Sequence, residues 1–180
     1  MTSLIPQLAK PVIPPIGTVK AFSFTNQDGV KITEKDMANK VTVVEFFFTT
    51  CKGICPRMNN NLRTIYDQFK SENNFLILSH TCDPATDSVA QLKRYSDSLA
   101  VDTKKWMFLT GSKDSLYHMA RHSYKIDDPK NDLNSIEDDF LHTQFMAIVN
   151  KKGDIVKIYD GLKKDEIKEM RSEIENLLKK

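Results

Sequence analysis

Two cysteines separated by three residues stand between a run of apolar residues and a proline. Cys51 and Cys55 follow the run 41–48, and Cys55 directly precedes Pro56. Thiols in such a pair exchange electrons as a dithiol and a disulfide, or they bind a soft metal ion as thiolates. The spacing by itself leaves both kinds of chemistry open, and it also allows a structural disulfide.

The residues around the pair predict a strand, a loop and a helix. The run 41–48 is rich in β-branched and aromatic residues, which is typical of a buried strand. We expect Pro56 at the first helical position, where its missing N–H costs nothing, and the start of a helix favours a thiolate. Apolar side chains then recur at helical spacing, which predicts a core role for each of them: Met58, Leu62, Ile65 and Phe69.

The rest of the chain predicts one α/β domain. Residues 1–19 form a proline-rich lead-in, and residues 20–180 form the domain. The order of elements predicts a thioredoxin-like fold, with a central mixed sheet flanked by helices and an N-terminal β-hairpin extension. The expected elements are a hairpin over 22–32, strands over 75–78 and 106–109, helices over 89–99 and 115–123, a polar loop over 127–139, a hairpin over 145–159 and a helix from 164.

The predicted sheet brings further metal-binding side chains toward the cysteines. Cys51 and Cys82 each follow a parallel strand, and ligands gather at the carboxyl ends of such strands. His142 precedes a strand expected to run antiparallel, so it falls at the same edge. Two thiolates and one imidazole suit copper in both oxidation states, and zinc accepts the same donors. The sequence predicts a site of Cys51, Cys55 and His142, while Cys82 is interpreted more simply as a small buried apolar residue.

Simpler interpretations apply to the remaining histidines. His118 and His122 are one helical turn apart, a spacing that can bind metal. No third ligand stands near them in the sequence, so we expect a solvated helix face. His80 lies in an alternating strand, where it packs or meets solvent.

Composition excludes several function classes. The chain has 180 residues, a net charge of +2 and no arginine-rich stripe, so no nucleic-acid partner is expected. No apolar run reaches the ~18 residues that a membrane span needs, and no signal peptide is visible. We therefore expect either a cytosolic protein or a soluble piece whose membrane anchor is missing from this chain.

Three motifs together resemble those of the Sco/SenC family. The segment 46–56 carries the Cys-x-x-x-Cys-Pro signature, and Asp83-Pro84 follows the second parallel strand as in the family. The segment 140–145, which contains His142, resembles the one that carries the family's histidine ligand. The resemblance covers residues 20–178, although Lys52, Gly53, Ile54 and Cys82 depart from the residues usual there.

The resemblance implies a copper metallochaperone, with Cu(I) and Cu(II) held by Cys51, Cys55 and His142. It also implies a role in assembly of the binuclear copper centre of cytochrome c oxidase, with subunit II or another copper-accepting protein as the partner. Family members are membrane-anchored, which implies the periplasmic face of the inner membrane in a bacterium rather than the mitochondrial intermembrane space.

Two redox functions compete with copper binding. In a thiol–disulfide oxidoreductase, Cys51 and Cys55 would be the redox-active pair, with one attacking a partner disulfide and the other resolving it. A thiol peroxidase needs a threonine and an arginine poised at the reactive cysteine, a pattern not evident here. Thioredoxins place a proline before the facing hairpin strand, whereas this chain has none after Pro129. We therefore favour copper, and expect no enzymatic activity beyond thiol–disulfide exchange.

Overall fold

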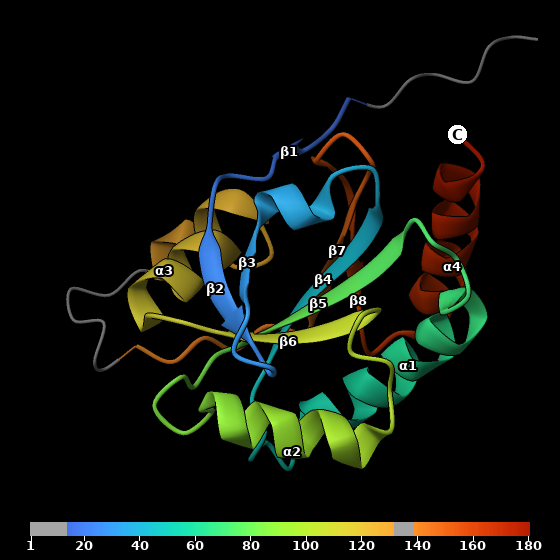
Figure 1. Ribbon diagram of the computed structural model, residues 1–180. Helices are drawn as coiled ribbons and strands as arrows, with labels where there is room; N and C mark the ends of the chain where they lie inside the picture. Colours follow the sequence, from blue (N-terminus) through green and yellow to red (C-terminus); the bar gives the residue numbers. More distant parts are fainter. Residues whose placement is uncertain (1–13, 132–138) are drawn as a thin grey trace, which may run out of the picture.

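A curved mixed sheet with helices on both faces forms the body of the protein (Figure 1). The computed structural model describes residues 14–131 and 139–180. The described residues contain one sheet of eight strands in the order β1-β8-β7-β4-β5-β6-β2-β3. The strands are β1 (Gly17–Thr18), β2 (Ser23–Asn26), β3 (Lys31–Thr33), β4 (Val41–Phe47), β5 (Phe75–Thr81), β6 (Trp106–Thr110), β7 (Phe145–Val149) and β8 (Asp154–Asp160).

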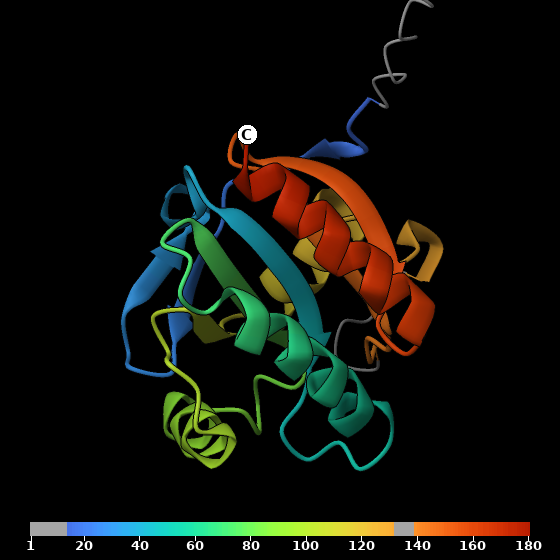
Figure 2. The ribbon, with the colours of Figure 1, turned by 90° about the vertical axis from the view of Figure 1, so that its right-hand side faces the viewer.

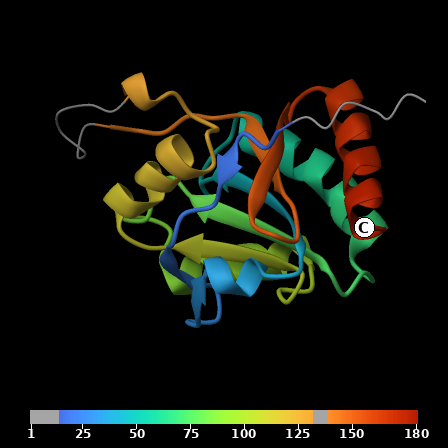
Figure 3. The same cartoon turned by 90° about the horizontal axis from the view of Figure 1, so that it is seen from above.

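The helices fall into two groups that cover opposite faces of the sheet. Helices α1, α2 and α4 pack on one face, with α1 and α4 side by side (Figure 2), and α3 lies on the other face (Figure 3). The α-helices are α1 (Ile54–Phe69), α2 (Val89–Leu99), α3 (Lys113–His118) and α4 (Lys164–Leu178). Short turns are η1 (Glu34–Met37), η2 (Met119–Ser123) and η3 (Pro129–Asn131).

The central strand β4 is apolar on both faces because helices cover both. Val43 and Phe47 join the core under α1, α2 and α4, whereas Val44 and Phe46 join the core under α3. Strand β4 pairs in parallel with β5 and antiparallel with β7. These directions confirm the predicted thioredoxin-like arrangement, and they place the end of β4, the end of β5 and the start of β7 at one edge of the sheet.

Several element boundaries differ from the predicted ones. Helix α1 begins at Ile54, two residues before Pro56, so the prediction that Pro56 starts the helix was wrong. The first four N–H groups of a helix have no partner within it, so a proline is tolerated beyond the first position. The helix expected over 115–123 begins at Lys113 and continues into the wider π-helical turn η2.

The N-terminal residues contribute to both edges of the sheet. Gly17 and Thr18, within the proline-rich lead-in, form β1 and pair with β8. The expected hairpin is present, with Gly29 at a positive φ of 76° in its turn, and its strand β2 pairs with β6. Residues 1–13, and 132–138 of the predicted polar loop, lie outside the described residues.

Candidate metal centre

The thiol of Cys51 lies at the start of helix α1, where backbone N–H groups are available to it. Gly53 is the N-cap residue of α1 and offers no side-chain acceptor to the first turn. Burial acts to raise the pKa of Cys51, but hydrogen bonds from the Cys55 thiol and from the backbone N–H groups of residues 53–55 outweigh it. The pKa of Cys51 is therefore lowered, and this half-buried thiol is the one poised to ionise.

The thiol of Cys55 has the opposite character. Cys55 is buried against the core, and burial, together with its hydrogen bond to Cys51, raises its pKa to about 12. The pair thus consists of a Cys51 thiol that loses its proton more readily than an ordinary cysteine and a Cys55 thiol that keeps its proton at neutral pH. All three cysteines are free thiols in this structure, and the free thiol is the form in which Cys51 and Cys55 can bind a soft metal ion.

A buried carboxylate anchors the cysteine loop to the neighbouring loop. Asp87 is fully buried and accepts hydrogen bonds from the backbone N–H of Thr49 at 3.1 Å and from its hydroxyl at 2.5 Å. The hydroxyl of Thr81 donates to the same carboxylate at 2.5 Å. Sequence reasoning missed Asp87, because no local pattern pairs it with a threonine 38 residues away.

A second buried carboxylate, Glu45, lies on β4 and influences the thiols. The hydroxyl of Ser79 donates to Glu45 Oε1 at 2.6 Å, and Trp106 Nε1 donates to that hydroxyl at 2.8 Å. The other oxygen, Glu45 Oε2, has no hydrogen-bond partner among the described residues. Burial raises the pKa of Glu45 to about 7, and its charge in turn raises the pKa of Cys55. In the sequence, the one indication that Glu45 is unusual is its position as a carboxylate within a strand that is otherwise uncharged and buried.

His142 lies at the same edge of the sheet as the cysteines, in the segment leading into β7. The register Val44↔Ala147 sets the start of β7 beside the end of β4. Phe140 links the two segments, because its ring centroid lies 5.1 Å from that of Phe48 and 4.8 Å from that of His142. The prediction of a shared edge is confirmed in this respect.

The structure does not bring the three predicted ligands into one coordination geometry. Within residues 14–131 and 139–180, no group of three or more His, Cys, Asp or Glu side chains is placed to hold a metal ion. His142 is exposed and lines a separate hollow of about 570 Å³ beside Lys125 and Asp127. The structure therefore brings Cys51 and Cys55 together without His142, and the assignment of all three as ligands stays a prediction.

The other sulfur and nitrogen candidates are accounted for by packing. Cys82 is buried, its N–H donates to the Phe47 carbonyl at 2.7 Å, and burial holds its pKa well above the ordinary value. Met58 is buried in the core under α1, as predicted. His80 is fully buried, with its ring stacked on Phe46 at 4.9 Å.

The loop that carries Cys51 and Cys55 joins the central strand β4 to helix α1, and the antiparallel hairpin of β7 and β8 follows later in the chain. This arrangement defines a thioredoxin-like domain with a thiol site. The SCO1/SenC family model matches residues 14–179, and the chain belongs to that family. It is 28% identical over 162 residues to the SCO1 protein homolog of Bacillus subtilis, which covers 88% of this chain and 81% of that protein.

Two solved structures illustrate the family. BsSco, described as a member of the Sco family of cytochrome c oxidase assembly proteins with a disulfide switch, superposes with a TM-score of 0.76 at 26% identity. That match covers 93% of this chain and 98% of the other. Arabidopsis thaliana ScoI with copper bound gives a TM-score of 0.66 at 28% identity, covering 91% and 96%. No helix in the described part of the chain is long and apolar enough to cross a membrane.

Proposed function

We propose that this protein is a copper metallochaperone that binds Cu(I) and Cu(II) through Cys51, Cys55 and His142. The observation that carries the proposal is the pair of free thiols at the start of α1, where hydrogen bonds lower the pKa of Cys51. Membership of the SCO1/SenC family, which includes a copper-bound plant protein, supports copper over zinc as the metal.

Each ligand has a distinct part in loading. Cys51 is the first donor, because it is partly exposed and its lowered pKa makes its proton the easier one to remove. Cys55 becomes the second donor when the metal displaces its proton, and two thiolates select Cu(I). The imidazole of His142 adds a nitrogen donor that lets the same site hold Cu(II). For this step the His142 side chain turns from Phe140 toward the cysteines.

Release follows from the exposure of the same groups. Cys51 and His142 both reach the surface, so ligands of an acceptor protein can replace them one at a time. We propose that the acceptor is subunit II of cytochrome c oxidase or another copper-accepting protein, and that delivery aids assembly of the binuclear copper centre. The related oxidase-assembly protein BsSco supports this assignment. We place the domain at an outward-facing membrane surface, periplasmic in a bacterium.

A second candidate function, thiol–disulfide exchange, is favoured by the unequal thiols. The partly exposed Cys51, with its lowered pKa, suits attack on a partner disulfide, and the buried Cys55 suits resolution of the mixed disulfide. Two electrons then pass to the partner, which leaves as a dithiol, and Cys51 and Cys55 form a disulfide. This reaction and copper delivery use the same reduced pair.

The test is a titration of the fully reduced protein with Cu(II), followed by absorption, and with Cu(I) against a chromophoric chelator. We expect a saturable sulfur-to-copper charge-transfer band at one equivalent, lost in Cys51→Ser and in His142→Ala. His142→Ala should weaken Cu(II) binding far more than Cu(I) binding, because two thiolates satisfy the softer ion.

Matched variants separate ligands from bystanders. Cys82→Ala and His122→Ala should retain the band at the first equivalent, since neither belongs to the proposed donor set. Equal loss of both ions in His142→Ala would refute its role. Copper that only oxidises the thiols, without a band, would favour the oxidoreductase.

A further inference from the structure

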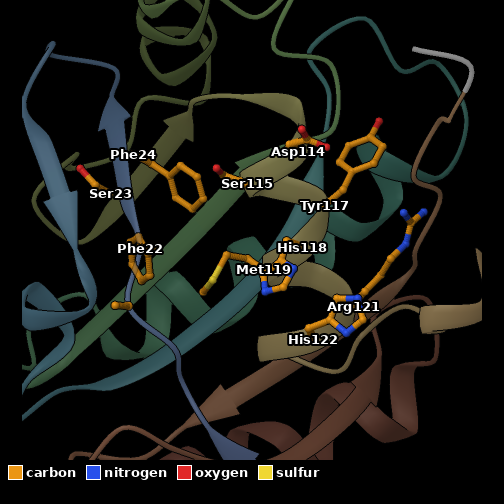
Figure 4. Close-up of a pocket in the computed structure, with 11 residues that line it drawn as sticks. Phe22, Ser23, Phe24, Asp114, Ser115, Tyr117, His118, Met119, Arg121 and His122 are labelled. Carbon is orange, nitrogen blue, oxygen red and sulfur yellow. The ribbon is translucent and has the colours of Figure 1, made fainter. Parts of the chain in front are cut away.

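Two histidines on the α3 side of the sheet lie next to each other. His118 is the last residue of α3, and His122 lies four residues later in the π-helical turn η2. Their ring centroids are 4.8 Å apart with an interplanar angle of 33°. Figure 4 shows both rings projecting from the same stretch of helix into one hollow. This pair is remote in sequence from the candidate copper ligands and is not used by the proposed function.

The spacing of the rings fits two imidazoles on one metal ion. A metal lies ~2.0–2.1 Å from a coordinating histidine nitrogen, so two neighbouring imidazole ligands have ring centres about 4.4–5.1 Å apart. The observed 4.8 Å falls within that interval. The wide turn contributes to this placement: the Tyr124 N–H bonds to the Met119 carbonyl, five residues back, at 2.8 Å. Such π-helical turns are frequent at functional sites.

The charges around the pair are compatible with a bound cation. The guanidinium of Arg121 is engaged by two carboxylates, Asp127 at 2.8 Å and Asp139 at 2.5 Å, and it points away from the two rings (Figure 4). The ammonium of Lys113 lies over the ring of Tyr117, 5.4 Å from its centroid. Asp114 lines the hollow and adds a negative charge to it.

The hollow leaves room for the remaining ligands of a metal ion. Its volume is about 660 Å³, and the opposite wall is formed by Phe22 and by Ser23 and Phe24 at the start of β2 (Figure 4). A two-histidine site fills two coordination positions, so water or a side chain of another protein takes the rest. With nitrogen donors and no thiolate, such a site prefers a borderline divalent ion over Cu(I).

We propose that His118 and His122 form a second metal site where α3 meets η2, specific for divalent transition-metal ions, with Cu(II) bound most tightly. Among divalent first-row ions, nitrogen donors bind Cu(II) most strongly. The site is weaker than a three-donor centre because the protein supplies two ligands. It provides a binding site for Cu(II) whose donors are nitrogens, in contrast to the thiols of the first site.

The test uses the full-length Cys51→Ser/Cys55→Ser protein, so that no thiolate pair contributes. Cu(II) titrated into it and followed by electron paramagnetic resonance should bind one equivalent with coupling to two nitrogens. His118→Gln and His122→Gln should each weaken binding by at least about tenfold, because the second imidazole no longer acts at high effective concentration. The matched control Glu169→Gln, a surface residue that belongs to neither proposed metal site, should leave binding unchanged.

A second preparation guards against misfolding of the double variant. Wild-type protein alkylated with iodoacetamide should show the same one-equivalent binding and the same loss in both histidine variants. Absence of saturable binding in both preparations would overturn the proposal, as would binding kept in both His118→Gln and His122→Gln. Because Cys51 and Cys55 are replaced or alkylated in these two preparations, the outcomes are independent of the charge-transfer band that tests the proposed copper centre.

Discussion

Replacing Glu45 with glutamine should remove a pH-dependent loss of stability from the protein. Glu45 is fully buried, and burial raises its pKa from the ordinary 4.5 to about 7. Between these pH values the folded protein keeps a proton that the unfolded chain releases. The free energy of unfolding therefore falls as pH rises above 4.5, and this loss is complete once pH exceeds 7.

The magnitude follows from the shift. A rise from 4.5 to about 7 corresponds to roughly 3 kcal/mol of stability lost on ionisation, at about 1.4 kcal/mol per pKa unit. Glutamine keeps the size of the side chain and the acceptor for the Ser79 hydroxyl, and it does not ionise. We therefore expect Glu45→Gln to be close to wild type at pH ~4, and more stable by up to ~3 kcal/mol at pH ~8.5.

The assay is urea unfolding of both proteins, metal-free and reduced, across this pH range. The difference between the two proteins isolates Glu45, because other titrating groups contribute to both. Glu169→Gln is the matched control, since the side chain of Glu169 is 63% exposed and its ion pair with Lys157 is a surface pair. That control should change stability by less than about 1 kcal/mol at either pH. A Glu45→Gln difference that does not grow with pH would refute the reasoning.

Two further predictions concern residues at the carboxyl end of β5, where His80 lies and where Thr81 bonds to Asp87. Asp87→Ala leaves the Thr49 N–H and two threonine hydroxyls without their acceptor, so urea unfolding at neutral pH should show a free energy of unfolding lower by ~2–3 kcal/mol. Asp97→Ala, at an exposed position, serves as the control. An equal loss of stability in that control would contradict the anchoring role of Asp87. Burial lowers the pKa of His80 to about 3, so the free energy of unfolding should fall as pH drops below 6.5. His80→Phe should flatten this acid-side loss in the same urea assay, and an unchanged pH dependence would show that His80 is not its source.

The elements that the sequence predicted best are those with local signals at both ends. Helix α2 spans Val89–Leu99 as predicted, because Ser88 caps it and its apolar residues recur at helical spacing. Strand β4 was predicted from its β-branched and aromatic run. The start of α1 was predicted at Pro56 because proline favours the first helical position. The whole first turn tolerates proline, however, and the helix begins at Ile54.

Contacts between distant segments lay beyond sequence reasoning. The network of Glu45, Ser79 and Trp106 joins three strands, and the position of a carboxylate within an apolar strand does not indicate which residues it bonds to. The shared edge of the cysteines and His142 followed from strand direction, which topology rules supply. Strand topology does not determine the direction of the His142 side chain, which contacts the ring of Phe140.

The strand register also determines how far apart the chain entry and the cysteine loop lie. Gly17 pairs with Ile155 at the start of β8, next to the end of β7 that pairs with Thr42 at the start of β4. The cysteine loop leaves the other end of β4, and the seven residues of this strand separate its two ends by ~20 Å. Figure 1 shows β1 and the start of α1 toward opposite ends of the sheet. The sheet therefore keeps the cysteine loop at the end of the domain away from Gly17. A protein that approaches the thiols does so at the end of the sheet opposite to the one where the chain enters it.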